Sequence, residues 1–242
     1  MSETTIALVT GANKGIGYEI AAGLGARGWK VGVGARDDAR REAAVEKLRA
    51  DGVDAFGVPL DVTDDASVAA AAQLLEEQGG LDVLVNNAGI TGGMPQEPTA
   101  VAIETMREAV EVNVFGVVRV INAMLPLLRQ SASPRIVNMS SSVGSLARQS
   151  STDDALTVGP VAAAYSPSKT YLNAVTVQYA RELQDTNILI NLGCPGFVAT
   201  DLNGFRGVRT PEEGARIAIS LATLPDDGPT GGYFEEAGAI PW

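Results

Sequence analysis

Short apolar runs and longer amphipathic stretches alternate along the chain. Runs rich in Val, Ile, Leu and Ala predict β-strands at 6–10, 30–35, 55–60, 81–85, 135–139, 187–192 and 232–234. Apolar positions at helical spacing predict helices at 15–27, 37–51, 64–78, 103–129, 165–184 and 211–224. Strands that alternate with helices form a parallel sheet covered on both faces through right-handed crossovers. No linker interrupts this pattern, so residues 1–242 are expected to form a single doubly wound, Rossmann-type α/β domain with about seven parallel strands.

Composition and charge exclude several classes of protein. The chain has 18 Lys and Arg against 29 Asp and Glu, a net charge of −11, which disfavours nucleic acid and anionic lipid as partners. With no His and one Cys, a zinc site or a Ser-His-Asp hydrolase is excluded, and no metal is expected. Residues 1–5 lack the basic region and apolar stretch of a signal peptide, and polar residues interrupt the apolar stretch 110–128, so neither a signal peptide nor a membrane span is expected. We therefore expect a cytoplasmic protein.

A glycine-rich turn follows the first predicted strand and precedes a helix. Gly11, Gly15 and Gly17 lie in the run Thr10-Gly-Ala-Asn-Lys-Gly-Ile-Gly17, with the spacing G-x-x-x-G-x-G. Glycines at such a turn let the backbone approach a pyrophosphate, and the helix N-terminus offers amides and a positive dipole to it. The turn therefore predicts a dinucleotide site.

Two basic residues indicate which dinucleotide binds. Arg36 ends the second predicted strand, where an NADP site places arginine for the ribose 2′-phosphate, and Lys14 lies inside the glycine turn. Two cations at one end of the pocket favour NADPH. Asp37 leaves NADH open, because an acid near this position is typical of NAD sites, although Asp37 is also a favoured N-cap for the next helix.

Further motifs at the ends of the predicted strands resemble those of the short-chain dehydrogenase/reductases, and most closely those of NADPH-dependent carbonyl reductases. The resemblance extends from about residue 6 to the C-terminus. The matching segments, in chain order, are Thr10 to Gly17, Asp61-Val62, Asn86-Asn87-Ala88-Gly89, Asn113, Ser141, Tyr165-x-x-x-Lys169 and Pro195-Gly196.

The resemblance implies catalytic roles for four residues. Tyr165 would donate a proton to the carbonyl oxygen, and Ser141 would hydrogen bond to that oxygen and orient it. Lys169 lies one helical turn after Tyr165, on the same face. Its ammonium, together with the positive charge of the oxidised nicotinamide, would lower the tyrosine pKa, and it would also hold the nicotinamide ribose. Asn113 would anchor a water that links Lys169 to solvent.

The resemblance also implies the residues that line the cofactor. Segments 141–165 and 195–210 are expected to form the substrate pocket. The expected cofactor-binding residues are Gly11, Asn13, Lys14, Gly15, Ile16, Gly17, Arg36, Asp61, Val62, Asn87, Ala88, Gly89, Tyr165, Lys169, Pro195, Gly196, Val198 and Thr200.

Two segments depart from the family pattern. Ser141 and Tyr165 are separated by about twice the usual distance, and in carbonyl reductases a longer insertion around 148–161 implies a monomer, which we favour over a homodimer or tetramer. The segment 201–209 is shorter than the helical lid that is common in the family. A short lid leaves the pocket open, which predicts weak discrimination among substrates.

These observations predict NADPH-dependent reduction of ketones, aldehydes or quinones to alcohols. Two alternatives stay open: another short-chain dehydrogenase of 3-oxoacyl or hydroxysteroid type, and a regulator that senses the dinucleotide without catalysis. The intact set of Ser141, Tyr165 and Lys169 favours an enzyme over the regulator.

Overall fold

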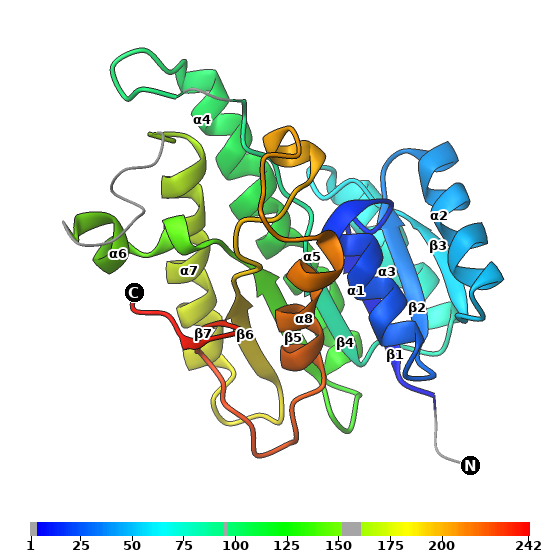
Figure 1. Ribbon diagram of the computed structural model, residues 1–242. Helices are drawn as coiled ribbons and strands as arrows, with labels where there is room; N and C mark the ends of the chain where they lie inside the picture. Colours follow the sequence, from blue (N-terminus) through cyan, green and yellow to red (C-terminus); the bar gives the residue numbers. More distant parts are fainter. Residues whose placement is uncertain (1–3, 94–95, 152–160) are drawn as a thin grey trace.

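An eight-stranded sheet forms the centre of the protein in a computed structural model that describes residues 4–93, 96–151 and 161–242 (Figure 1). The strand order is β3-β2-β1-β4-β5-β6-β7-β8. All neighbours pair in parallel except β8, which is antiparallel to β7. The strands are β1 (Ile6–Thr10), β2 (Lys30–Ala35), β3 (Ala55–Pro59), β4 (Val83–Asn86), β5 (Arg135–Met139), β6 (Leu189–Gly193), β7 (Tyr233–Glu235) and β8 (Gly238–Ala239).

The doubly wound α/β prediction is confirmed, with one strand more than the seven expected. The additional strand, β8, has two residues, which is too short to show a period in the sequence.

Helices cover both faces of the sheet. One face carries α1 (Gly15–Gly25), α2 (Asp38–Ala50) and α8 (Pro211–Ala222), and the other carries α3 (Asp65–Glu77), α5 (Gly116–Leu128) and α7 (Tyr165–Glu182). Four shorter helical segments come after strands of the sheet in the chain: α4 (Ile103–Val110) after β4, η2 (Ser142–Gly144) and α6 (Leu146–Ser150) after β5, and η4 (Asp201–Asn203) after β6.

The alternation within β1 shows how the two cores form. Ala7 and Val9 point into the core beneath α1, α2 and α8, whereas Ile6 and Leu8 point into the core beneath α3, α5 and α7. Successive side chains of a strand point to opposite faces, so a strand buried on both faces is apolar at every position.

The helix expected at 103–129 is interrupted by one wider turn. Residues Glu111–Phe115 form a π-helical segment between α4 and α5. The prediction of a continuous α-helix is wrong here, because one extra residue in a turn barely alters the apolar pattern. Such π-turns are frequent at functional sites, and this one contains Asn113.

Ile103–Leu128 is the one helix in the described part of the chain that is long and apolar enough to cross a membrane. Val117 and Ile121 on this helix are buried against the sheet, in the same core as β4 and β5 residues. A buried core helix can have the same length and composition. The contacts of Val117 and Ile121 with the sheet indicate that this helix is such a core helix.

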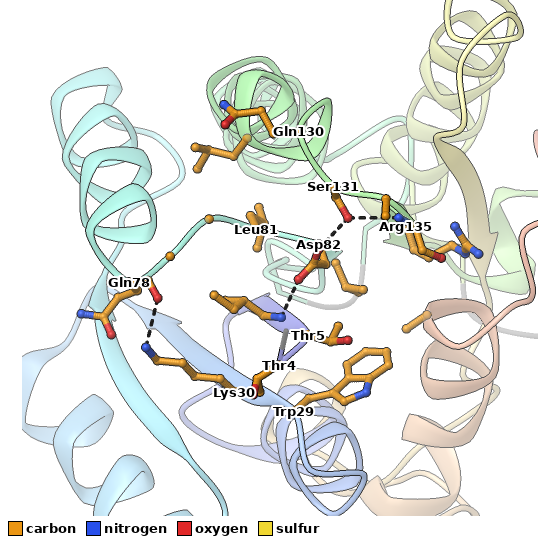
Figure 2. A pocket seen from close by; sticks show the side chains of 18 of the residues that line it. Thr4, Thr5, Trp29, Lys30, Gln78, Leu81, Asp82, Gln130, Ser131 and Arg135 are labelled. Atoms are coloured by element: carbon orange, nitrogen blue, oxygen red, sulfur yellow. Dashed lines mark hydrogen bonds between the residues drawn. The ribbon is translucent and has the colours of Figure 1, made fainter. Parts of the chain in front are cut away.

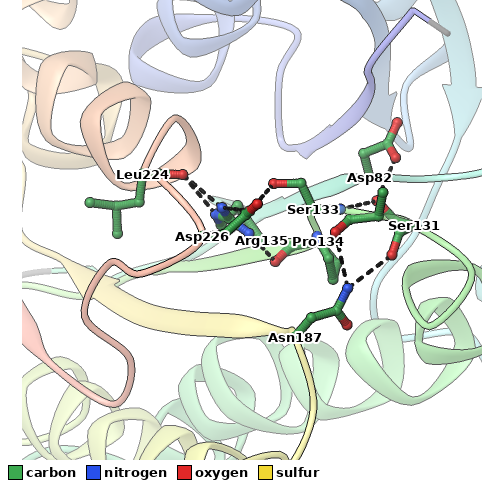
Figure 3. Close-up of polar contacts among 9 residues, drawn as sticks. Asp82, Ser131, Ser133, Pro134, Arg135, Asn187, Leu224 and Asp226 are labelled. Carbon is green, nitrogen blue, oxygen red and sulfur yellow. Dashed lines mark hydrogen bonds and ion pairs between the residues drawn. The ribbon is translucent and has the colours of Figure 1, made fainter. Parts of the chain in front are cut away.

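The amino ends of the strands border a cavity of about 1100 Å³ (Figure 2). Asp82 ties two segments together here, because its carboxylate accepts from the Ile6 N–H at 2.8 Å and from the Ser131 hydroxyl at 2.5 Å. The buried Arg135 donates to the Leu224 carbonyl at 2.7 Å and pairs with Asp226 at 2.7 Å (Figure 3). These contacts tie the start of β5 to the segment after α8, on the side of the sheet opposite the strand ends that carry the predicted site.

Arg135→Met is expected to lower the free energy of unfolding by about 2–4 kcal/mol. The substitution leaves the Leu224 and Pro134 carbonyls without the guanidinium that now donates to both. Urea denaturation measures the loss, with Arg129→Met on the exposed end of α5 as the matched control. A change below about 0.5 kcal/mol in the Arg135 variant, the range of ordinary surface substitutions, would contradict this assignment.

Candidate active site

At the carboxyl edge of the sheet lies a second cavity, of about 430 Å³. Ligands of doubly wound folds bind at this edge, where the strand order reverses on either side of β1. The cavity gathers most of the residues that the sequence assigned to a dinucleotide: Gly11, Asn13, Lys14, Gly15, Ile16, Gly17, Arg36, Asp61, Val62, Asn87, Ala88, Gly89 and Thr200.

The glycine turn is interlocked with the segment after β4. The Thr10 hydroxyl accepts from the backbone N–H groups of Asn87 and Ala88, each at 3.0 Å. A Cβ on Gly17 would lie 2.4 Å from the Gly11 carbonyl oxygen and 2.5 Å from Asn87 Nδ2. Only glycine fits there, so the close approach of the two segments shapes the floor of the cavity.

The basic residues lie at one end of this cavity. Arg36 is exposed there, and it contributes to lowering the pKa of Asp61 after the larger effect of hydrogen bonds from Thr63. The Asp37 carboxylate accepts from the Arg40 N–H at 2.9 Å, so Asp37 caps α2 as the sequence predicted. Arg40 also lines the cavity. Sequence analysis missed it, although its place one turn after Arg36 was a usable signal.

Lys14 reaches across the mouth of the cavity. Its ammonium pairs with Asp201 of η4 at 2.9 Å, and the hydrogen bond from Lys14 lowers the pKa of Asp201. Both side chains are about half exposed, so solvent screens the pair and the lysine is free to exchange partners. Lys14 is therefore available to an anion in the cavity.

Ser141, Tyr165 and Lys169 come together beside the cavity. Ser141 follows β5, and its side chain contacts that of Tyr165, the first residue of α7. Lys169 Nζ lies 5.8 Å from the centre of the Tyr165 ring and donates to the Met139 carbonyl at 2.8 Å. The four-residue spacing thus places the lysine on the same side of α7 as the tyrosine.

Burial controls the protonation of this pair. It raises the pKa of Tyr165 to about 12, against the opposing effect of Ser141, and it lowers the pKa of Lys169 to about 8. Desolvation of the phenolate is the largest cause of the Tyr165 shift, because a charged oxygen loses its water when the ring is buried. The phenol keeps its proton at neutral pH.

Asn113 is fully buried and fixes the backbone of Ile90, which lines the 430 Å³ cavity. Its amide exchanges hydrogen bonds with Ile90, donating to the carbonyl at 2.8 Å and accepting from the N–H at 2.9 Å. Its second donor reaches the Ser168 hydroxyl on α7 at 2.9 Å. A Cβ on Gly89 would lie 3.1 Å from Asn113 Oδ1 and 3.6 Å from Lys169 Nζ, so both residues face this glycine.

The C-terminal segment supports Ser141 from behind. The Tyr233 hydroxyl donates to the Ser141 carbonyl, and the Ser145 hydroxyl donates to the Pro241 carbonyl at 2.5 Å. The Trp242 carbonyl accepts from the Ala147 N–H at 2.8 Å. Sequence reasoning missed these contacts, since nothing in a tyrosine near the C-terminus indicates which distant carbonyl it meets.

Some predicted residues lie elsewhere. Within the described part of the chain, Pro195, Gly196 and Val198 are not among the residues that line the 430 Å³ cavity, and neither are Tyr165 and Lys169. The expected pocket segment 141–165 is described as far as residue 151 and again from residue 161, so most of the insertion expected at 148–161 lies outside the described residues.

Comparisons with known proteins agree with this arrangement. The family model for short chain dehydrogenases matches residues 5–208. Carbonyl reductase (NADPH) 1 of Bos taurus is 35% identical over 279 aligned residues, covering 100% of this chain and 99% of the relative. The structure of NADPH-bound carbonyl reductase from chicken fatty liver has a TM-score of 0.86 at 29% identity, covering 99% of this chain and 100% of that one. Salutaridine reductase from Papaver somniferum has a TM-score of 0.83 at 32% identity, covering 96% and 99%.

The chain belongs to the short-chain dehydrogenase family. It is an oxidoreductase of a family that uses nicotinamide dinucleotides and acts on alcohol and carbonyl groups. The cavity fits such a cofactor, since Gly11, Gly15, Gly17 and Gly89 let the backbone line it closely and its rim carries Lys14, Arg36 and Arg40.

Proposed function

We propose that the protein is an NADPH-dependent carbonyl reductase that converts ketones, aldehydes or quinones to alcohols. The observation that carries this proposal is the side-by-side placement of Ser141, Tyr165 and Lys169 next to a cavity with a basic end. The likeness to NADPH carbonyl reductases over the whole chain supports it.

The bound NADPH would supply a hydride to the carbonyl carbon. Ser141 holds the carbonyl oxygen by donating a hydrogen bond, and Tyr165 donates its phenolic proton to that oxygen as negative charge develops there. With a pKa of about 12, Tyr165 is protonated at neutral pH and can donate its proton as the substrate oxygen becomes negatively charged. The Lys169 ammonium stabilises the phenolate that remains, and Met139 fixes its position.

The segment after η4 supports an open, apolar substrate entrance. The Ala199 N–H donates to the Arg209 carbonyl at 2.8 Å, which closes the segment into a short loop rather than a lid. Phe205 and Val208 on this loop are exposed, Phe205 by 64%, and so is Phe197 just before it. Apolar walls with few converging polar groups discriminate weakly, so we propose a broad range of small-molecule carbonyl substrates.

The experiment that tests the function is the oxidation of NADPH and NADH in the presence of a panel of ketones, aldehydes and quinones. Turnover of several unrelated carbonyls with NADPH is the expected result. Tight binding of NADPH without turnover of any of them would contradict the proposal and favour a dinucleotide sensor. A preference of more than about a thousandfold for one substrate over close analogues would contradict its breadth, since one methylene in an apolar pocket contributes only about 1–3 kcal/mol.

Arg36→Ala is expected to weaken NADPH binding by about 10- to 100-fold while leaving NADH binding nearly unchanged. A charge-assisted contact with the 2′-phosphate contributes about 1.5–3 kcal/mol, and NADH lacks that phosphate. Dissociation constants for the two cofactors, measured by fluorescence titration, check this. Arg27→Ala, in the exposed turn that follows α1, is the matched control. Equal losses for both cofactors would show that Arg36 does not bind the 2′-phosphate.

A further inference from the structure

Gln96 is a buried polar residue that the reaction scheme does not use. Its side chain is 2% exposed, and its carboxamide makes four hydrogen bonds. The Nε2 group donates to the carbonyls of Thr91 at 2.7 Å and Gly93 at 2.6 Å. The Oε1 atom accepts from the N–H groups of Ala164 at 3.0 Å and Tyr165 at 3.2 Å. A single side chain thus connects the loop after β4 with the start of α7.

The start of α7 lacks a cap from its own sequence. The N-cap residue is Ala164, which has no side-chain acceptor, and the first N–H groups of any helix have no partner within it. Gln96 supplies that acceptor from a distant part of the chain. Its backbone adds a third contact, because the Gln96 carbonyl accepts from the Ala163 N–H at 3.2 Å. Gln96 therefore fixes the backbone of the first turn, at the residue that carries the phenol.

Ile90, which precedes Thr91 and Gly93, is fixed to α7 as well. Ile90 lines the cofactor cavity, and Asn113 ties it to Ser168 of α7. Ile90 and Gln96 are thus each tied to α7, Ile90 through Asn113 and Ser168 and Gln96 at Ala164 and Tyr165. The distance between the cofactor wall and the tyrosine depends on both attachments.

We propose that Gln96 is a positioning residue for the proton transfer: it fixes the start of α7 so that the Tyr165 phenol lies within reach of the carbonyl oxygen. The inference rests on the proposed function, since it takes Tyr165 as the proton donor. Gln96 accepts from the backbone N–H of Tyr165 and does not line the cofactor cavity, so it acts on the tyrosine through the backbone. Misplacement of a reacting group by about 1 Å can cost about a hundredfold in rate.

Gln96→Leu tests the proposal, because leucine has similar volume but no acceptor for the two N–H groups. The expected result is a 10- to 100-fold lower kcat with the NADPH dissociation constant within twofold of wild type. Gln96→Glu keeps the oxygen that accepts from Ala164 and Tyr165 but loses the NH2 that donates to the Thr91 and Gly93 carbonyls. Its kcat is expected to stay above that of the Leu variant, because the contacts with α7 remain. Gln130→Leu, in the exposed turn after α5, is the matched control and should leave both quantities unchanged.

Amide hydrogen exchange gives a readout that does not depend on turnover. Exchange at Ala164 and Tyr165 should be at least tenfold faster in the Leu variant than in wild type, and close to wild type in the Glu variant. If the Leu variant shows no cooperative thermal transition, Gln96→Asn, which is one methylene shorter, replaces it with the same expected losses.

Three outcomes would overturn the proposal: a kcat within twofold of wild type in the Leu variant, equal losses of kcat and NADPH affinity, or unchanged exchange at both amides. The proposed function fails separately. Should wild type reduce no carbonyl, or should Tyr165→Phe stay active, the reductase assignment falls and hydrogen exchange still decides whether Gln96 fixes the start of α7.

Discussion

Tyr165→Phe is expected to lower kcat by a factor of about 10²–10⁴, the usual contribution of general acid catalysis. The aromatic ring stays in place beneath Lys169, and only the hydroxyl that carries the proton is lost. The NADPH dissociation constant should therefore stay within about twofold of wild type, because the substitution keeps the ring and removes only its hydroxyl. Steady-state reduction of an activated ketone and a fluorescence titration with NADPH measure the two quantities.

Tyr171→Phe is the matched control for this result. Tyr171 lies on the same helix, is exposed, and packs edge-on against Phe115 with ring centres 6.2 Å apart. Loss of its hydroxyl should leave kcat unchanged. If Tyr165→Phe kept more than a tenth of the wild-type kcat, Tyr165 would not be the proton donor.

The fold could be predicted because its local signals agree with its tertiary contacts. The strand predicted at 6–10 is observed with the same bounds, since a β-branched run buried on both faces has no other stable arrangement in a parallel sheet. Asp37 and Asp64 begin α2 and α3 as N-caps, each accepting a hydrogen bond from a backbone N–H of the first turn. Here a short polar side chain alone decides where the helix starts.

The parts that could not be predicted depend on contacts between distant segments. The π-turn around Asn113 fixes the amide against Ile90, and neither residue reveals this pairing in the sequence. Gln96 and Tyr233 meet backbone groups of the catalytic segments far along the chain. The spacing of Tyr165 and Lys169 predicts a shared helix face, but the degree of burial that sets their pKa values is a property of the whole fold.

Lys169→Met is expected to lower kcat/KM for carbonyl reduction by about 10²-fold and to weaken NADPH binding by about 10-fold. Methionine preserves the length and packing of the side chain and removes only the ammonium. The free energy of unfolding should change little, because the lost hydrogen bond to the Met139 carbonyl is offset by removal of a buried group whose charge burial disfavours, as its lowered pKa of about 8 shows.

The pH dependence of the same variant separates the charge from the shape of the side chain. Lysine is charged below its pKa, so in wild type the ammonium is lost as the pH rises through about 8, and kcat/KM should decline above that pH. Tyr165, with a pKa of about 12, stays protonated over this range and contributes no step of its own. The decline should be absent from Lys169→Met. It should persist in Lys47→Met, whose exposed lysine likewise lies over a tyrosine ring, 4.6 Å from the centre of Tyr18. A wild-type profile that is flat between pH 7 and 9, or one that Lys169→Met reproduces, would show that the charge of Lys169 does not support proton transfer.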